Sequence, residues 1–290
     1  MSTSVIIVSY HTGPVLKACV EAARACAWVG DIVIVDNGND EQAQLWMDDC
    51  AAADDAITIL RGQGNIGFSR ACNAGVKASR GRFLLFLNPD AVLQEGALQA
   101  LHQALAGAPA GSVAGARLLN TDGSEQRGAR RGRLTPWAAL VSMTGLCRFE
   151  KVHPIFTNMH QEGQPLPDAP VPVYAVSGAC LLVKRKDFEA LGGYDDGYFL
   201  HVEDLDLCRR VRKKGGRAMF VPTAEVVHHG STSRTSRLVV DWHKAKGLAR
   251  YYVRFAHSPL EKTGALLLVI PVMTAVMARS LVISLKSWIS

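Results

Sequence analysis

Short apolar runs alternate with amphipathic stretches over the first 120 residues. The apolar runs predict buried strands at residues 5–10, 32–36, 57–60, 83–87 and 113–118. The stretches between them predict helices at residues 14–28, 41–51, 69–79 and 95–106. Continuous apolar strands separated by helices are typical of a mostly parallel sheet covered by helices on both faces. We therefore expect an α/β domain that binds its ligand at the carboxyl ends of the strands.

This regular pattern stops at residue 119. Residues 119–172 are rich in Gly, Pro, Arg and polar side chains, which predicts a long loop or a partly ordered insertion. A long loop inside a compact domain usually serves function. Regular structure is expected again at residues 173–183, then in a helix that carries Glu203 and Asp204, and in short strands at residues 217–221 and 225–227.

A different composition marks the C-terminal region, and we separate residues 236–290 from a domain at residues 1–235. Residues 241–255 predict a basic, aromatic helix, and residues 264–278 are almost continuously apolar. This apolar stretch reaches the ~20 residues of a membrane-spanning helix only by including Arg279. Its basic and aromatic flanks favour a helix that lies on a membrane surface. The alternatives are burial against the domain or a dimer partner, and a true membrane span.

Composition narrows the class of protein. With 290 residues, of which 48% are hydrophobic and 20% charged, the chain can bury a large core. Its net charge of +6 suits anionic partners such as phosphates, nucleic acid or an anionic membrane. Seven cysteines without a CxxC pair argue against a disulfide framework or structural zinc and predict a reducing compartment. The absence of a secretory signal predicts a cytoplasmic location.

Two adjacent carboxylates, Glu203 and Asp204, stand at the start of a predicted helix in an otherwise apolar segment. Carboxylates are rarely buried unless they are paired or take part in chemistry. The helix dipole at this end favours the ionised form, which is the form that a general base needs. The alternative is simple helix capping, since acidic residues are common at helix starts.

Two further segments suit a nucleotide. Asp36 ends the second predicted strand, where its carboxylate could accept hydrogen bonds from a nucleoside, although the following Asn-Gly also suits a plain turn. The Gly-rich segment at residues 62–73 opens a helix, and backbone amides at a helix start favour phosphate. This segment lacks the P-loop pattern, and Ser69 as a helix cap is the alternative.

Two positions suit a divalent cation. Asp90 follows the fourth predicted strand, where one carboxylate together with phosphate oxygens and water would make a typical Mg²⁺ environment. A turn or capping role is the alternative for Asp90. His228 and His229 follow a short strand, and histidine is a common metal ligand, although core or surface packing explains most histidines.

These segments occur in a particular order along the chain, which is more specific than any one of them. The order is Ser9-Tyr10, Val35-Asp36-Asn37, Asn65-Ile66-Gly67-Phe68 with Asn73, Asn88-Pro89-Asp90, residues 178–184, residues 192–195, residues 203–208 and His228-His229-Gly230. This series closely resembles family 2 glycosyltransferases, in particular the rhamnosyltransferase-like branch of bacterial cell-surface glycan synthesis. The resemblance covers about residues 3 to 235.

The resemblance implies a GT-A fold, a single Rossmann-like α/β domain with a mostly parallel mixed sheet, followed here by the C-terminal helices. It implies inverting transfer of a sugar from a nucleoside-diphosphate sugar, with dTDP-rhamnose favoured as the donor and Mg²⁺ or Mn²⁺ as the cofactor. The acceptor would be lipid-linked or a polysaccharide. The protein would act on the cytoplasmic face of the inner membrane, without a nucleic acid partner and with a homodimer as an open alternative.

The resemblance also implies roles for particular residues. Asp204 would be the catalytic base with Glu203 as its support, and Asp90 and His228 would hold the metal. Asn88 stands where the family has the first acid of its metal motif, which leaves Asp90 as the main carboxylate. The nucleotide sugar would contact Ser9, Tyr10, Asp36, Asn65, Gly67, Asn73, Asn88, Asp90 and Arg130. Arg127, Arg130 and Arg131 in the insertion could also close over the diphosphate. The alternative is that these arginines form a solvated basic segment without this role.

Two other functions compete with this interpretation. A sugar-phosphate nucleotidyltransferase would have a Gly-rich start after the first strand, which is missing here, and would leave Glu203 and Asp204 without a role. A non-catalytic, membrane-docked nucleotide-sugar-binding protein would have no need of Asp90, Asp204 and His228. The sequence therefore favours the transferase.

Overall fold

The computed structural model describes residues 2–230 and 235–256 and, beyond them, residues 258–260, 262–264, 267, 270 and 274. Its strands are β1 (Thr3–Ser9), β2 (Val29–Asp36), β3 (Ile57–Leu60), β4 (Phe83–Leu87), β5 (Ala91–Leu93), β6 (Val113–Leu119), β7 (Arg130–Arg131), β8 (Val171–Val173), β9 (Ala175–Val176), β10 (Cys180–Lys184) and β11 (Ala218–His228). Its helices are α1 (Val15–Arg24), α2 (Glu41–Ala53), α3 (Phe68–Ala78), α4 (Ala97–Ala106), α5 (Pro136–Thr144), α6 (Arg185–Ala190), α7 (Glu203–Lys213) and α8 (Arg237–Phe255), with 3-10 helices η1 (Leu146–Phe149) and η2 (Pro154–Phe156).

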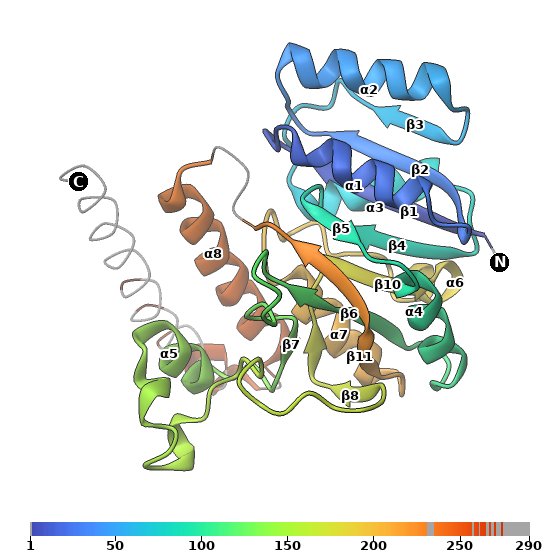
Figure 1. The fold of residues 1–290 in the computed structure, drawn as a ribbon. Helices are drawn as coiled ribbons and strands as arrows, with labels where there is room; N and C mark the ends of the chain where they lie inside the picture. The colour runs from blue at the N-terminus through green and yellow to red at the C-terminus, as the bar shows by residue number, and fades with distance from the viewer. Residues whose placement is uncertain are drawn as a thin grey trace.

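Within the described residues, nine strands form the main sheet, in the order β3-β2-β1-β4-β10-β6-β11-β5 with β8 beside β11 (Figure 1). Strands β3, β2, β1 and β4 are parallel, and β11 is parallel to β6. The antiparallel strand β10 lies between these two groups and pairs with both β4 and β6. The prediction of a mostly parallel mixed sheet in an α/β fold is therefore confirmed.

One edge of this sheet collects the polar segments. Since β10 runs antiparallel to both of its neighbours, the carboxyl ends of β1, β2, β4 and β11 lie along the same edge. Ser9 at the end of β1 stands opposite Asp36 at the end of β2. At β11, His228 stands opposite Ala91, the residue after Asp90. The strand ends thus bring residues from distant parts of the chain to one edge, as expected for ligand binding in such sheets.

The structure differs from the predicted elements in several places, including β5 and α6, which were not predicted. The strands predicted at residues 217–221 and 225–227 form one strand, β11, with an irregularity between Val221 and Glu225 that accommodates a proline inside the sheet. The helix predicted at residues 14–28 ends at Arg24, because Trp28 already accepts a backbone hydrogen bond from Thr3 of β1. The predicted loop at residues 119–172 contains β7, α5, η1, η2 and the start of β8.

Helix α8 packs into the same core as the sheet. Leu248, Tyr251, Tyr252 and Phe255 on this helix are buried in the core. The predicted division at residues 235 and 236 stays a prediction, and α8 lies on its C-terminal side. No helix in the described residues is long and apolar enough to cross a membrane, and most of the predicted interfacial stretch lies outside those residues.

All seven cysteines belong to the described residues and are free thiols. Cys19, Cys72, Cys180 and Cys208 are buried among core residues. None of the seven forms a disulfide in the structure.

The contact between α8 and the segment before α7 depends on a glycine. A Cβ atom on Gly247 would lie 3.1 Å from Val202 Cγ2 and 3.2 Å from the carbonyl oxygen of His201. Gly247→Ala should therefore lower the free energy of unfolding by about 1–3 kcal/mol through overpacking, which thermal denaturation would measure. Gly264→Ala is the matched control, because a Cβ there meets nothing within 4 Å and alanine is the better helix former. Equal melting temperatures for the two variants would contradict this close contact.

Candidate active site

A strained turn positions the two adjacent carboxylates. His201 and Val202, which precede α7, have φ angles of 65° and 75°. This left-handed conformation is unfavourable for any side chain and most of all for a β-branched one such as valine. Helix α8 contacts the turn at two points, since Phe199 stacks on His243 with a centroid distance of 4.2 Å and Gly247 lies against Val202. These contacts maintain the unfavourable backbone conformation directly before Glu203 and Asp204, the first two residues of α7.

Asp204 is fully engaged by protein donors. Its Oδ2 accepts hydrogen bonds from the Arg131 guanidinium and from the Gly178 amide at 2.9 Å, and its Oδ1 accepts one from the Leu205 amide at 2.7 Å. Burial alone would raise the Asp204 pKa, but the Arg131 charge and these hydrogen bonds outweigh it and lower the pKa. Asp204 is therefore ionised at neutral pH.

Glu203 has the opposite environment. It is 6% exposed, and its Oε2 has no hydrogen-bond partner within the part of the chain that the structure describes. Burial, reinforced by the neighbouring Asp204 charge, raises the Glu203 pKa to about 8. The expectation that the helix start favours ionisation thus holds for Asp204 only. Neither residue is the N-cap of α7, which is Val202 without a side-chain cap bond, so plain capping does not explain the pair.

A cavity of about 540 Å³ lies against this carboxylate pair. Its walls come from the insertion, from the start of α7 and from α8. The cations at its surface are Arg127, Arg131 and Lys244, and its apolar lining includes Leu134, Ala139, Met159, Leu205, Val240 and Leu248. Burial and then these cations lower the pKa of His160 to about 3 and that of His201 to about 4. Both imidazoles are therefore neutral at physiological pH.

A second polar cluster lies at the ends of β4 and β11. His228 Nε2 is 3.1 Å from Asp90 Oδ1 and 3.1 Å from Asn88 Nδ2. On the other side of the ring, His228 Nδ1 bonds Gln126 Oε1, and Gln126 Nε2 donates to the His228 carbonyl oxygen at 3.0 Å. Gln126 thereby fixes the imidazole, as partners of metal-ligating histidines do.

This donor set fits a divalent cation that is shared with a ligand. The described residues contain no group of three or more His, Cys, Asp or Glu side chains that could hold a metal alone. One carboxylate and one imidazole leave coordination positions for phosphate oxygens and water, which is how Mg²⁺ is usually held. Asp90 and His228 could therefore hold a cation only together with a phosphorylated ligand.

A short segment before β10 joins the two clusters. The Asn88 amide donates to the Ala179 carbonyl oxygen at 2.8 Å, and the preceding Gly178 amide donates to Asp204. A Cβ atom on Gly178 would lie 3.3 Å from Asp204 Cβ, so the backbone must approach closely here. The carboxylate pair and the Asp90–His228 cluster are therefore neighbours in one site.

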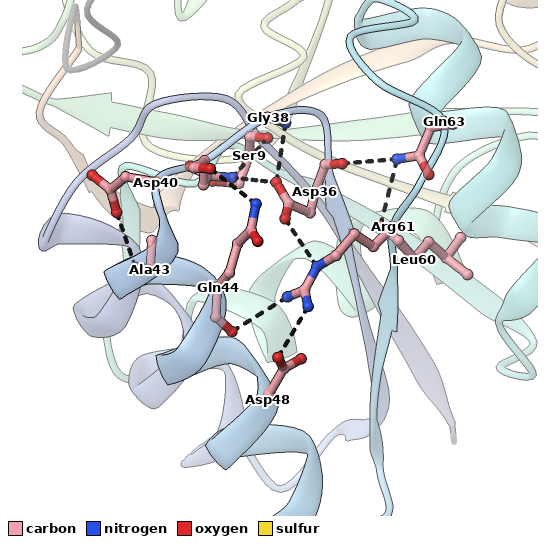
Figure 2. Close-up of polar contacts among 11 residues, drawn as sticks. Ser9, Asp36, Gly38, Asp40, Ala43, Gln44, Asp48, Leu60, Arg61 and Gln63 are labelled. Carbon is pink, nitrogen blue, oxygen red and sulfur yellow. Dashed lines mark hydrogen bonds and ion pairs between the residues drawn. The ribbon is translucent and has the colours of Figure 1, made fainter.

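The end of β2 forms a third part of the site (Figure 2). Asp36 Oδ1 accepts hydrogen bonds from the Gly38 amide at 3.0 Å and from Asn39 Nδ2 at 2.8 Å, and Oδ2 accepts one from Arg61 Nε at 3.2 Å. Arg61 reaches across to Asp48 of α2 as well. Ser9 Oγ donates to the Asn39 side chain at 3.1 Å. Asp36 and Ser9, both predicted to bind the nucleotide sugar, thus share one network.

The Gly-rich segment connects this network to the carboxylates. Asn65 Oδ1 accepts a hydrogen bond from the Gly67 amide at 3.1 Å. Gly67 has a φ of 82°, and a Cβ atom there would lie 2.7 Å from the Phe199 carbonyl oxygen. Near the end of β1, the ring of Tyr10 lies against Gly38. Ser9, Tyr10, Asp36, Asn65 and Gly67 therefore lie on one side of the site, next to the turn that precedes α7.

Comparison with known families identifies this combination. A model described as "Glycosyltransferase like family 2" matches residues 2–245. The chain belongs to glycosyltransferase family 2. The match extends ten residues beyond the predicted limit near residue 235, into α8. The prediction that the chain is a glycosyltransferase is confirmed.

Relatives and solved structures agree with this assignment. The N-acetylglucosaminyl-diphospho-decaprenol L-rhamnosyltransferase of Mycobacterium tuberculosis is 29% identical over 244 residues, which are 79% of this chain and 76% of that protein. GalNAc-T7 with UDP, GalNAc and Mn²⁺ has a TM-score of 0.60 and 17% identity over 88% of this chain, which spans about half (52%) of that protein.

The mannosyltransferase PcManGT from Pyrobaculum calidifontis, in complex with GDP-Man and Mn²⁺, has a TM-score of 0.57 and 14% identity. That match covers 97% of this chain and 75% of the mannosyltransferase chain. At such identities the two structures bear on the fold alone, and the predicted GT-A fold is confirmed.

Two predicted site residues of this glycosyltransferase have structural contacts instead. Asn73 donates to the Tyr194 carbonyl oxygen and to Asp196, and its own oxygen accepts the Tyr194 amide. Arg130 is 5% exposed, and it bonds both oxygens of Glu125 as well as two backbone carbonyl oxygens of the insertion. The adjacent Arg131 lines the cavity. Nucleotide contact by Asn73 and Arg130 remains a prediction.

Two site residues have no counterpart among the predictions. Arg61 follows β3 directly, and its position at a strand end beside Asp36 could have indicated it. Gln126 lies in the insertion, and no pattern in that segment distinguishes it from the polar residues around it. Only the folded chain places its amide beside His228.

The raised Glu203 pKa has a consequence for stability. The folded state keeps this proton between the ordinary pKa of 4.5 and about 8, whereas the unfolded chain loses it. Stability from this group is therefore lost as pH rises through that interval, by up to about 1.4 kcal/mol per pH unit. Glu203→Gln removes the effect, so its stability relative to the unmodified protein should increase from pH 5 to pH 8 in urea denaturation. Glu189→Gln, at a position exposed on α6, is the control and should show no such trend; a flat difference for Glu203→Gln would refute the shift.

Proposed function

We propose that this glycosyltransferase inverts the configuration of the transferred sugar and uses Asp204 as its general base. The observation that carries the proposal is the divided carboxylate pair beside the cavity, in which Asp204 is ionised and Glu203 keeps its proton. Inverting transfer needs one carboxylate that removes the proton from an acceptor hydroxyl opposite the leaving group. A protonated neighbour can donate a hydrogen bond to the same acceptor without competing for its proton.

The bonds change in one displacement. The acceptor hydroxyl gives its proton to Asp204 while its oxygen forms the bond to the anomeric carbon. The bond between that carbon and the diphosphate oxygen breaks, and the nucleoside diphosphate leaves with the electron pair. Arg131 must first release Asp204 Oδ2, and an incoming diphosphate competes for the guanidinium because phosphates are bidentate partners of arginine. Binding of the nucleotide sugar would in this way free Asp204 Oδ2 to accept a proton.

A cation, Mg²⁺ or Mn²⁺, would be held by Asp90 and His228, with Gln126 orienting the imidazole and Asn88 beside it. When bound, such a cation neutralises the charge that develops on the leaving diphosphate. The Asp36 network, together with Asn65 and Gly67, would receive the nucleoside. Each group lies at the sheet edge where ligands of such folds bind.

The relatives and the cavity support a proposal for the donor and the acceptor. We propose rhamnose from dTDP-rhamnose, in keeping with the mycobacterial relative that carries a rhamnosyltransferase name. The cavity combines apolar walls with the cations Arg127 and Lys244, which suits a lipid-linked acceptor with a phosphate near its sugar. Its volume of about 540 Å³ falls within the usual range for small-molecule sites. The enzyme would then act in cell-surface glycan synthesis, on the cytoplasmic face of the membrane.

Substitution of the base tests the mechanism. Asp204→Asn should lower kcat/KM by about 100-fold or more, because general base catalysis contributes about 10²–10⁴-fold. Nucleotide-sugar affinity, measured by titration calorimetry, should stay close to that of the unmodified enzyme. Undiminished turnover in the variant would remove Asp204 as the base, and a parallel loss of donor affinity would point to a binding role.

Removal of the cation tests the second cluster. Excess EDTA should stop transfer, and added Mg²⁺ or Mn²⁺ should restore it. His228→Ala should weaken the apparent affinity for the added metal by about tenfold or more. His229→Ala is the matched control, because only the backbone amide of His229 bonds Asp90. Full activity in EDTA, or equal metal dependence of the two variants, would refute the assignment.

A further inference from the structure

An exposed apolar cluster lies on the insertion, outside the cavity. Its side chains and their exposed fractions are Trp137 (43%), Phe149 (38%), Val152 (78%) and Ile155 (51%). They come from α5, η1, η2 and the turn between η1 and η2, over residues 136–156. Figure 1 shows this segment projecting from the sheet, far from α2 at the other end of the molecule. Contiguous exposed apolar side chains of this kind mark an interaction surface.

The cluster is preorganised. Trp137 Nε1 donates to the Ile155 carbonyl oxygen at 2.7 Å, which ties α5 to η2. Phe156 fills the space between the parts, with ring centroids 6.4 Å from Trp137 and 6.1 Å from Phe149. The apolar side chains are thus held at the surface by specific contacts, whereas a loosely packed loop would fold them inward.

Helix α5 itself lacks the polar face that a surface helix normally has. Residues 136–144 contain no charged side chain. Ala139 and Ser142 face the cavity, and Val141 is buried, which leaves Trp137 pointing outward. A helix without a charged face is usually buried against other apolar groups. We therefore expect the outer face of α5 to contact an apolar environment.

The charges around the cluster identify that environment. Residues 127–156 carry six basic side chains and one acidic one, Glu150. Arg130 and Arg131 are neutralised by Glu125 and Asp204. Arg127 Nε lies 3.9 Å from Glu162 Oε1. The other basic residues of the segment are Arg133, Arg148 and Lys151. Aromatic and aliphatic side chains among basic ones complement an anionic bilayer surface, where tryptophan and arginine lie at the headgroup level.

We propose that residues 136–156 dock the enzyme on an anionic lipid bilayer, with Trp137, Phe149, Val152 and Ile155 entering the headgroup region. Arg148, whose guanidinium lies 4.7 Å from the centre of the Phe149 ring, and Lys151 contact the anionic headgroups. The inner face of α5 lines the cavity, so docking places the cavity next to the bilayer. Residues 136–156 are separate in sequence from the apolar C-terminal stretch, and their docking does not depend on the catalytic assignments.

Vesicle sedimentation of the full chain tests the proposal. The variant Trp137→Ser/Phe149→Ser/Val152→Ser/Ile155→Ser should bind vesicles of phosphatidylcholine and phosphatidylglycerol at least about tenfold more weakly than the unmodified chain. Leu45→Ser is the matched control, because Leu45 is 59% exposed on α2 and should not affect binding. Arg148→Gln/Lys151→Gln should weaken binding by about fivefold per charge on these vesicles but little on pure phosphatidylcholine. Melting temperatures show whether each variant is folded.

A variant of the C-terminal stretch separates the two membrane hypotheses. Leu281→Ser/Val282→Ser/Leu285→Ser changes residues outside the described part of the chain. The proposal is overturned if this variant loses vesicle binding while the cluster variant keeps it. It is also overturned if the unmodified chain does not bind vesicles and is a dimer in solution, whereas the cluster variant is a monomer. Unchanged turnover of the cluster variant on a water-soluble acceptor would support a role confined to docking, whether or not the proposed donor is correct.

Discussion

The candidate active site of this glycosyltransferase depends on two adjacent carboxylates that share one buried helix start. Two such charges cannot both be ionised cheaply in a low-dielectric setting, so their pKa values separate. Arg131 and two backbone amides stabilise the charge on Asp204. Burial, reinforced by that charge, raises the Glu203 pKa and keeps Glu203 protonated. The arrangement needs an insertion that supplies the arginine and a turn in an unfavourable conformation.

The contacts that position this pair come from segments far apart in the sequence. Gly178 links Asp204 to the Asp90–His228 cluster, and Gly67 presses the Gly-rich segment against Phe199. Helix α8 closes the turn from the other side at Gly247. The same insertion that carries Arg131 also carries the exposed apolar cluster, so the cluster and the arginine that bonds Asp204 lie on one structural element. A lipid-linked acceptor that enters beside α5 would reach the carboxylates directly.

Much of this could be predicted from the sequence, because strand and helix periodicity is local and the site motifs follow strand ends. The insertion could not be predicted in the same way. Arg130 and Arg131 look alike in the sequence, yet they lie on a two-residue strand whose side chains alternate, so one is buried against Glu125 and the other faces the cavity. The raised Glu203 pKa likewise arises mainly from burial in the folded chain, which the local sequence around Glu203 does not show.

The configuration of the product tests the central claim most directly. The enzyme would be incubated with a panel of nucleotide sugars and an acceptor, and the anomeric configuration of the product would be determined by NMR together with the nucleotide released. Inverting transfer with Asp204 as the base predicts a product of the opposite anomeric configuration and release of the nucleoside diphosphate. A product of retained configuration, or release of pyrophosphate, would contradict it.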